Sequence, residues 1–174
     1  DFRVLGNSLV GGSEAGIVYV AYDKNKNGKP DTDEWYEIAG SATLDPAKET
    51  WYNDQMGRDF DVKTYRDYTV TYQRPTVETP KDVRWRDNKG ESGWIPKNSY
   101  HEQTYYPQWI KESSYTLSGT RLPQNGYNKQ TAENPFFVCL AFGYGYADNV
   151  PNTDRGATID IDWAIDKAGK PVHL

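Results

Sequence analysis

The sequence contains one cysteine, one methionine and two histidines in 174 residues. A single cysteine excludes an internal disulfide framework, so the fold must depend on its core and on any bound metal. Cys139 lies in the apolar run 135–142, where a small buried hydrophobic residue is a better interpretation than a nucleophile.

Catalytic motifs are equally scarce. His101 and His173 do not form a paired-histidine zinc motif, and the sequence has neither a nucleophile elbow nor a phosphate-binding glycine loop. We therefore expect a protein that is not an enzyme. A glycoside hydrolase stays open as an alternative, because 25 acidic residues allow many carboxylate pairs. Sequence alone does not place two of them the required ~5–10 Å apart.

Basic runs and long apolar runs are also missing. The formal charge of −5 at pH 7 argues against a nucleic-acid partner. No apolar stretch is long enough to cross a membrane, and no signal peptide is recognisable. Because the sequence begins at Asp1 without a methionine and ends in a segment typical of a strand, we expect a processed form or a fragment of a longer chain.

Aromatic residues are plentiful instead, with 14 tyrosines and 6 tryptophans. Together with 15 glycines and 10 prolines, they favour an all-β fold with many turns. The length suits one domain. We predict a single β-sandwich domain over residues 1–174, of jelly-roll type, with about nine short strands.

Strands are expected where β-branched and aromatic residues alternate with polar ones. They cover residues 1–5, 16–22, 35–39, 68–72, 83–86, 92–95, 115–122, 136–142 and 157–165. Residues 136–142 are the candidate for the most buried strand, and residues 87–90 predict the turn of a hairpin. The long polar stretch 41–66 is expected to be either a mobile excursion or a segment with a short helix.

Residues 23–34 carry the strongest functional signal. Oxygen-bearing side chains fall at positions 1, 3, 5, 9 and 12 of this stretch: Asp23, Asn25, Asn27, Asp31 and Glu34. Gly28 occupies position 6, where a twelve-residue calcium loop turns sharply, and Lys29 at position 7 would contribute only its backbone carbonyl. Calcium takes about six to eight oxygen ligands, so this spacing predicts a calcium site.

A solvated turn is the alternative for the same stretch, because Asn, Gly and Asp dominate turns. Four acidic groups within twelve residues favour a cation, since like charges folded close together repel one another. The flanking segments are typical of strands rather than of EF-hand helices. We therefore expect a structural ion that holds a connection between two strands.

Aromatic rings outside clean strands are the candidates for ligand binding, because an exposed ring can stack on a sugar or a corrin. These candidates are Trp94, Tyr105, Tyr106, Trp109, Tyr144 and Tyr146. The alternative for each ring is that it packs in the core. Trp35, Trp85 and Trp163 are expected in the core.

Four segments carry a family resemblance. They are residues 27–40 (Asn-Gly-Lys-Pro-Asp to Glu-Trp-Tyr-Glu-Ile-Ala-Gly), 69–75 (Thr-Val-Thr-Tyr-Gln-Arg-Pro), 106–110 (Tyr-Pro-Gln-Trp-Ile) and 143–149 (Gly-Tyr-Gly-Tyr-Ala-Asp-Asn). On these segments nearly the whole chain resembles cell-surface proteins of anaerobic gut bacteria, often described as PKD-containing. The insertion 47–63 departs from that pattern, and the family's domain begins earlier and continues past Leu174.

The resemblance implies a location and partners rather than an activity. Similar proteins are lipid-anchored and are encoded beside outer-membrane nutrient receptors, some of them in cobalamin-uptake loci. With the loop and the aromatic rings, this predicts a calcium-stabilised cell-surface binding module for a glycan or another nutrient ligand. A structural or adhesive spacer domain, a cobalamin-uptake accessory protein and the glycoside hydrolase stay open as alternatives.

Overall fold

The computed structural model describes residues 1–49, 51, 62–76, 82–97, 102–128, 131–133 and 137–174. Phe136, His101 and residues 52–61 of the predicted polar stretch lie outside the described residues. The described residues are mostly strand with little helix, which confirms the prediction of an all-β fold. The jelly-roll arrangement stays a prediction.

The elements are short, as the many turn residues lead one to expect. The strands among the described residues are β1 (Gly16–Ile17), β2 (Tyr19–Ala21), β3 (Trp35–Ile38), β4 (Tyr65–Gln73), β5 (Val83–Asp87), β6 (Ser92–Ile95), β7 (Ser114–Arg121), β8 (Gly126–Asn128), β9 (Phe137–Cys139), β10 (Tyr146–Ala147) and β11 (Ala164–Ile165). The helical elements are α1 (Ser41–Leu44) and the 3-10 helices η1 (Pro46–Lys48), η2 (Arg155–Ala157) and η3 (Ile161–Trp163).

The chain divides into two compact units. Unit 1 comprises Asp1–Thr64 and Leu122–Leu174, and unit 2 comprises Tyr65–Arg121. Each unit is described by itself below. The prediction of one domain over residues 1–174 stays a prediction.

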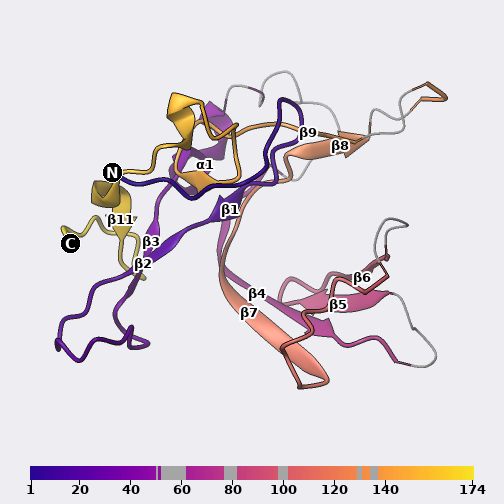
Figure 1. Ribbon diagram of the computed structural model, residues 1–174, viewed down its shortest axis with the longest axis horizontal. Helices are drawn as coiled ribbons and strands as arrows, with labels where there is room; N and C mark the ends of the chain where they lie inside the picture. Colours follow the sequence, from indigo (N-terminus) through magenta and orange to yellow (C-terminus); the bar gives the residue numbers. More distant parts are fainter. Residues whose placement is uncertain (50, 52–61, 77–81, 98–101, 129–130, 134–136) are drawn as a thin grey trace. The chain divides into compact units, whose positions relative to one another are not determined.

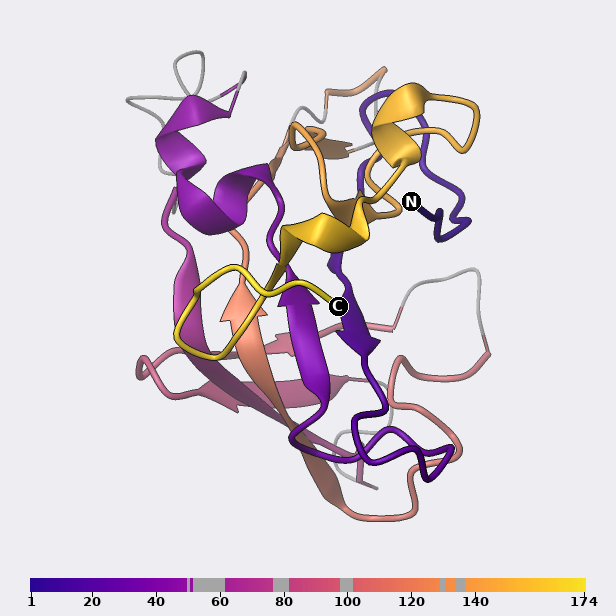
Figure 2. The ribbon, with the colours of Figure 1, turned by 90° about the vertical axis from the view of Figure 1, so that its left-hand side faces the viewer.

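Unit 1 is built from three small antiparallel sheets with the strand orders β11–β3–β2, β1–β10 and β8–β9. In the first of these, the C-terminal strand β11 lies beside the early strand β3 (Figures 1 and 2). Two groups of buried side chains form the core: Ala42, Trp51, Phe142 and Tyr146 in one, and Ile38, Ile159 and Ala164 in the other. Burying these side chains ties both ends of the sequence into one unit.

Unit 2 is a four-stranded antiparallel sheet with the order β6–β5–β4–β7 (Figure 1). Its register places Tyr72 opposite both Trp85 and Tyr115, so rings gather on one face of the sheet. The rings of Tyr72 and Tyr115 stack with centroids 5.2 Å apart, and Val70 and Val83 are buried on the same face. Because side chains alternate along each strand, the polar residues between them share the opposite face.

The predicted hairpin is confirmed as β5 and β6. The N–H of Asp87 donates to the carbonyl of Glu91 (2.9 Å). The Asp87 carboxylate accepts the N–H groups of Lys89 (2.9 Å) and Glu91 (2.8 Å). Gly90 has φ +91°, a conformation that residues with a side chain rarely adopt. This turn therefore fixes the register of the two strands.

The strand predicted at residues 157–165 is wrong. Asp154 accepts the N–H of Gly156 (2.7 Å), and Asp160 accepts the N–H of Asp162 (3.0 Å). These bonds begin the 3-10 helices η2 and η3, because a short acidic side chain offers the backbone a local partner in place of a neighbouring strand. The end of the predicted stretch alone joins a sheet, as β11.

Other strand predictions need smaller corrections. Residues 1–5 contribute an isolated bridge between Phe2 and Ile159 rather than a strand. The strand β9 is not the most buried one, since Phe137 is exposed and the buried Phe142 lies beyond its end. The described part of the stretch 41–66 contains α1 and η1, which confirms a short helix there. Within the described ranges, no helix has the length and apolar composition needed to cross a membrane.

Candidate functional site

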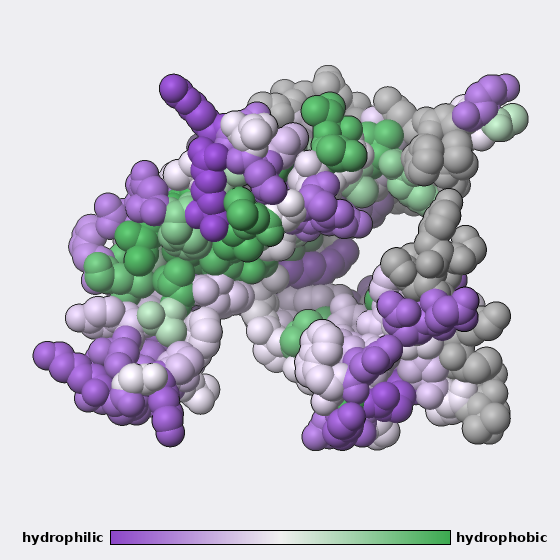
Figure 3. Space-filling model, viewed as in Figure 1, coloured by the Kyte–Doolittle hydropathy of each residue, from purple (hydrophilic) through white to green (hydrophobic). Residues whose placement is uncertain are grey.

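The loop at residues 23–34 closes the β2–β3 hairpin. Ala21 pairs with Trp35, and the N–H of Tyr22 donates to the carbonyl of Glu34 (3.0 Å). The loop extends from the end of these strands and is predominantly hydrophilic (Figures 1 and 3). The predicted ligand stretch therefore connects two paired strands, as the sequence indicates.

Side-chain oxygens of the loop accept its own backbone N–H groups. Asp23 accepts from Asn27 (3.1 Å) and Gly28 (2.8 Å), and Asn27 accepts from Lys29 through its amide oxygen (2.8 Å). Gly28 has φ +75°, as the sharp turn at position 6 requires. These bonds wrap the chain around the Asp23 carboxylate.

Three predicted ligands meet at the centre of the loop. The amide nitrogens of Asn25 and Asn27 both donate to the same oxygen of Asp31, at 2.6 Å and 2.8 Å. Rotating either amide by a half-turn would put its oxygen in place of its nitrogen, at the cost of the bond that the oxygen now accepts, from the N–H of Asn27 at Asn25 (3.0 Å) and from the N–H of Lys29 at Asn27. The arrangement could then present carboxylate and amide oxygens to a common point.

Glu34 is the most enclosed residue of the loop, with 2 % of its surface exposed. Its carboxylate accepts the N–H groups of Lys24 (2.7 Å) and Asp31 (3.0 Å). In the part of the chain that the structure describes, no three His, Cys, Asp or Glu side chains form a cluster suited to a metal. A calcium site in the loop would therefore also need the amide oxygens of Asn25 and Asn27 and the backbone carbonyl of Lys29.

The predicted ligand-binding rings of unit 2 divide into exposed and buried ones. Trp94 is 63 % exposed, Trp109 is 79 % exposed, and Tyr105 is also exposed. Tyr106 is only 3 % exposed: its hydroxyl donates to the carbonyl of Glu112 (2.9 Å), and its ring packs edge-on against Tyr115. The prediction that Tyr106 binds a ligand is wrong, because its polar tip has a backbone partner and its ring belongs to the core.

The two predicted rings of unit 1 differ in the same way. Tyr144 lies partly exposed against Trp163, with ring centroids 4.6 Å apart. Tyr146 is 1 % exposed, and its hydroxyl accepts the N–H of Thr43 (3.0 Å). Burial raises the pKa of Tyr146 to about 12. Tyr146 is therefore a core residue, and its prediction as a ligand contact is wrong.

The three tryptophans predicted for the core are not all buried. Trp35 is 44 % exposed, because it stands at the open end of β3 beside the loop, so its assignment to the core is wrong. Trp163 is partly buried against the Ile38 group of unit 1. Trp85 is partly buried and packs over Gly93, where an added Cβ would lie 3.1 Å from its ring.

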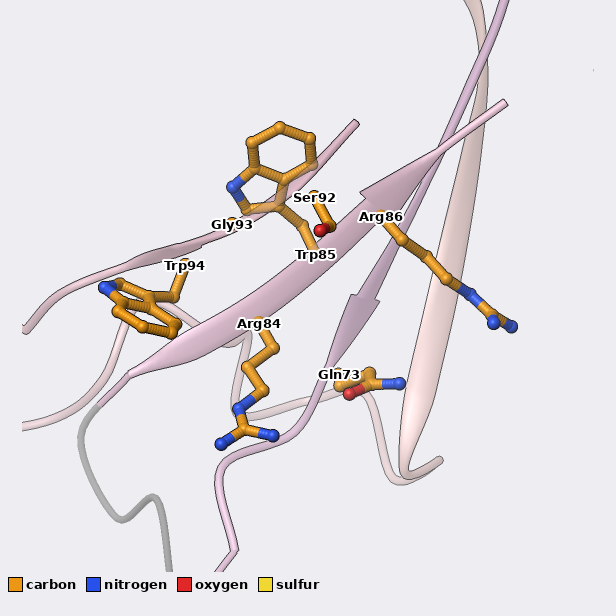
Figure 4. A pocket seen from close by; sticks show the side chains of 7 residues that line it. All are labelled: Gln73, Arg84, Trp85, Arg86, Ser92, Gly93 and Trp94. Carbon is orange, nitrogen blue, oxygen red and sulfur yellow. The ribbon is translucent and has the colours of Figure 1, made fainter. Parts of the chain in front are cut away.

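A groove of about 650 Å³ lies along β4, β5 and β6 of unit 2. It is lined by Gln73, Arg84, Trp85, Arg86, Ser92, Gly93 and Trp94. The register pairs Arg84 with Trp94 on one side and with Gln73 on the other. Figure 4 shows Arg84 and Arg86 on the opposite side of their strand from the Trp85 ring. The groove thus combines one exposed indole with amide, hydroxyl and guanidinium groups.

The sequence contained a signal for this groove that the prediction missed. In Val-Arg-Trp-Arg (residues 83–86), Arg84 and Arg86 are two residues apart, so both fall on one face of a strand. A turn over residues 87–90 alone would pair Arg84 with Gly93, whereas the observed register is one residue further and pairs Arg84 with Trp94. The sequence predicts Trp94 as a single exposed ring. It does not predict that Arg84 and Gln73 lie beside it on the neighbouring strands.

Cys139 is partly buried on β9. Burial raises the pKa of its thiol, and so the thiol is protonated at neutral pH and is a weak nucleophile. This agrees with the interpretation of Cys139 as a packing residue.

No protein-family model matches the chain, and the comparison with curated proteins gave no significant match. The resemblance to cell-surface proteins therefore stays a prediction.

Proposed function

We propose that this protein is a calcium-stabilised binding module of the cell surface, and that it binds a glycan in the groove of unit 2. The exposed indole of Trp94 in that groove is the observation that carries the proposal. A pyranose ring presents an apolar face of C–H groups, which stacks on an indole, while its hydroxyls need hydrogen-bond partners. Gln73 and Ser92 offer such partners beside the ring.

The size and position of the groove support a ligand of several sugar units. A volume of about 650 Å³ lies within the ordinary range of ligand sites. The groove runs across strands whose other face is packed with aromatic rings, so its backbone is held rigid. A site that is already formed loses little conformational entropy when it binds.

Calcium in the loop at residues 23–34 would stabilise unit 1 rather than take part in recognition. Asp23, Asn25, Asn27, Asp31 and Glu34 supply side-chain oxygens, and Lys29 supplies a carbonyl. The loop joins β2 and β3, so an ion held there would resist fraying of that hairpin.

The resemblance suggests where the module acts. We place it on the outer face of the outer membrane, next to a nutrient receptor. Labelling of intact cells with a membrane-impermeant reagent would test this location, and co-purification with an outer-membrane receptor would test the partner. Protection of the protein in intact cells would contradict the placement.

A glycan array with the wild type, Trp94→Ala and Trp109→Ala tests the function. Trp109 is even more exposed than Trp94 but does not line the groove, so its variant is the matched control. We expect Trp94→Ala to weaken glycan binding about tenfold or more and Trp109→Ala to leave it unchanged. If Trp94→Ala and Trp109→Ala bind the glycan with equal affinity, the groove is not the binding site.

A cobalamin titration run in parallel separates the nutrient classes. Binding of cobalamin but of no glycan would replace the sugar with a corrin as the ligand. Binding of neither would favour the structural spacer.

A further inference from the structure

We propose that the groove of unit 2 selects anionic glycans, chains that carry carboxylate or sulfate groups, over neutral ones. This inference rests on the proposed glycan-binding function and deepens it. Two exposed arginines of the groove, Arg84 and Arg86, carry guanidinium groups that could bind such a charge.

Arg84 and Arg86 stand on the same face of β5. They are two residues apart, so their Cα atoms are about 7 Å apart along the strand. Arg84 lies between Trp94 and Gln73 in the register, and Arg86 lies between Ser92 and Thr71. Each arginine therefore has a polar or aromatic residue opposite it on both neighbouring strands.

Both arginines are exposed, and within the described residues neither takes part in an ion pair. Other arginines of the chain are used to hold loops. Arg74 donates to the carbonyls of Glu112 and Ile110 and lies over the Tyr106 ring. Arg3 donates to Thr158 Oγ1 (3.0 Å) and to the carbonyl of Asn152 (2.8 Å).

Among the carboxylates near the two arginines in sequence, Asp82 and Glu91 form no ion pair with either arginine in the described residues, and Asp87 and Asp67 are engaged elsewhere. Asp87 accepts N–H groups of its own turn, and alternation puts it on the opposite face from Arg86. Asp67 pairs with Lys89 at 2.9 Å. The face that carries the groove thus has two arginines that form no ion pair with a described residue, although the whole chain has a formal charge of −5.

Carboxylate and sulfate groups fit this arrangement. A guanidinium binds either group with two parallel hydrogen bonds, and such charge-assisted bonds are stronger than those to neutral hydroxyls. A neutral glycan would use the Trp94 ring and Gln73 but would leave both guanidinium groups to water. The acidic chain as a whole repels long polyanions, so attraction depends on close contact in the groove.

Matched glycan pairs test the inference by calorimetric titration of the whole chain. Polygalacturonate and its fully methyl-esterified form differ in carboxylate charge, while chondroitin sulfate and desulfated chondroitin, which keeps its carboxylates, differ only in sulfate. We expect the more highly charged member of at least one pair to bind about tenfold more tightly. The two pairs distinguish carboxylate from sulfate as the recognised group.

Arginine variants assign the preference to the groove. We expect the double substitution Arg84→Gln, Arg86→Gln to abolish the preference for the charged member while neutral glycans still bind. The double substitution to Lys keeps the charge but loses the two-bond geometry, so it should retain a reduced preference. Lys167→Gln, which removes one exposed charge from unit 1, is the control and should change nothing.

The possible results separate this inference from the proposed function. If the wild type binds the more and the less charged members of both pairs equally and Trp94→Ala weakens both, glycan binding stands and the anionic preference is overturned. If no glycan binds, both fail. Tighter binding of single-stranded DNA than of any glycan also overturns the inference, because stacking and arginine contacts would then serve a nucleic acid.

Discussion

The loop at residues 23–34 and the groove of unit 2 satisfy their polar groups in opposite ways. In the loop, the Asp23, Asp31 and Glu34 carboxylates all accept hydrogen bonds from the loop itself. In the groove, Arg84 and Arg86 reach solvent and make no ion pair with any described residue. Internal satisfaction indicates a structural role, whereas exposed donors on a rigid face indicate a role in binding.

This contrast separates stability from recognition within one chain. Substitutions in the loop should change the free energy of unfolding and leave ligand affinity unchanged. Substitutions in the groove should do the reverse.

Glu34→Ala should destabilise the protein by about 2–4 kcal/mol, because it leaves two partly buried N–H groups of the loop without their acceptor. Urea unfolding in the presence of a chelator measures this loss apart from any bound ion. Asp33→Ala removes the same charge from an exposed side chain and should change stability by about 0.5 kcal/mol or less. Equal effects of the two substitutions would mean that the loop bonds are not stabilising.

Calcium should raise the melting temperature of the wild type, and a chelator should reverse the rise. At a calcium concentration one hundred times the Kd, the gain in unfolding free energy is about 2.7 kcal/mol. Glu34→Ala should lose this response, and Asp33→Ala should keep it. A melting temperature of the wild type that ignores both calcium and chelator would contradict the calcium assignment.

Glu49 in unit 1 fits neither side of the comparison between loop and groove. It is buried, unlike the arginines of the groove, but its hydrogen bonds are incomplete, unlike those of the loop carboxylates. One carboxylate oxygen accepts the N–H of Gly143 (2.8 Å), while the other has no hydrogen-bond partner among the described residues. Burial raises the pKa of the Glu49 carboxyl, which the hydrogen bonds from Ser41 and Gly143 partly oppose. This group therefore favours the folded state most when it is protonated.

The sign of the pH dependence follows from that shift. Between the unfolded and the folded pKa the folded protein binds more protons, so stability falls as pH rises through this window. Glu49→Gln should remove this fall, and thermal melts from about pH 4 to pH 7 should show a flatter profile than the wild type. Glu102→Gln, at an exposed carboxylate, should keep the profile of the wild type.

Arg84→Gln and Arg86→Gln should change the free energy of unfolding least, by about 0.5 kcal/mol or less, because both side chains are exposed. Urea unfolding of each variant measures this. A larger loss of unfolding free energy would mean that the arginines stabilise the sheet. The groove residues would then have a structural role, as the loop residues do.

The sequence predicted well what depends on local chemistry. The spacing of Asp23, Gly28 and Glu34 placed a wrapped loop between two strands, and the turn before Gly90 placed a hairpin. Both features are set by residues within a dozen positions of one another. Local backbone preferences are enough to specify them.

Predictions failed where a local cue competed with a longer-range partner. Proline and glycine around Tyr106 and Tyr146 suggested loops at the surface, yet the hydroxyls of these rings bond backbone groups and the rings fill the core. At residues 157–165 the alternation of apolar and acidic residues suggested a strand. Instead, the Asp160 side chain accepts the N–H of Asp162 and begins a 3-10 helix. The alternating pattern does not predict this local hydrogen bond.

The groove of unit 2 is not predicted from the sequence because its lining comes from three strands. Gln73, Arg84 and Trp94 are neighbours only because their strands pair. The formal charge of −5 describes the whole chain and does not indicate that two arginines lie together on one face. A strand-by-strand reading of which residues share a face would have found Arg84 and Arg86 together.

The turn at residues 87–91 has an effect that reaches well beyond its own hydrogen bonds. Because side chains alternate with a period of two, a slip of one residue between β5 and β6 would move Trp94 out of line with Arg84 and turn one of the two strands over. Any relative that keeps the same groove can thus gain or lose residues in this turn only in ways that preserve the pairing. The length of the four-residue connection 88–91 therefore decides which side chains of β5 and β6 share the face that carries the groove.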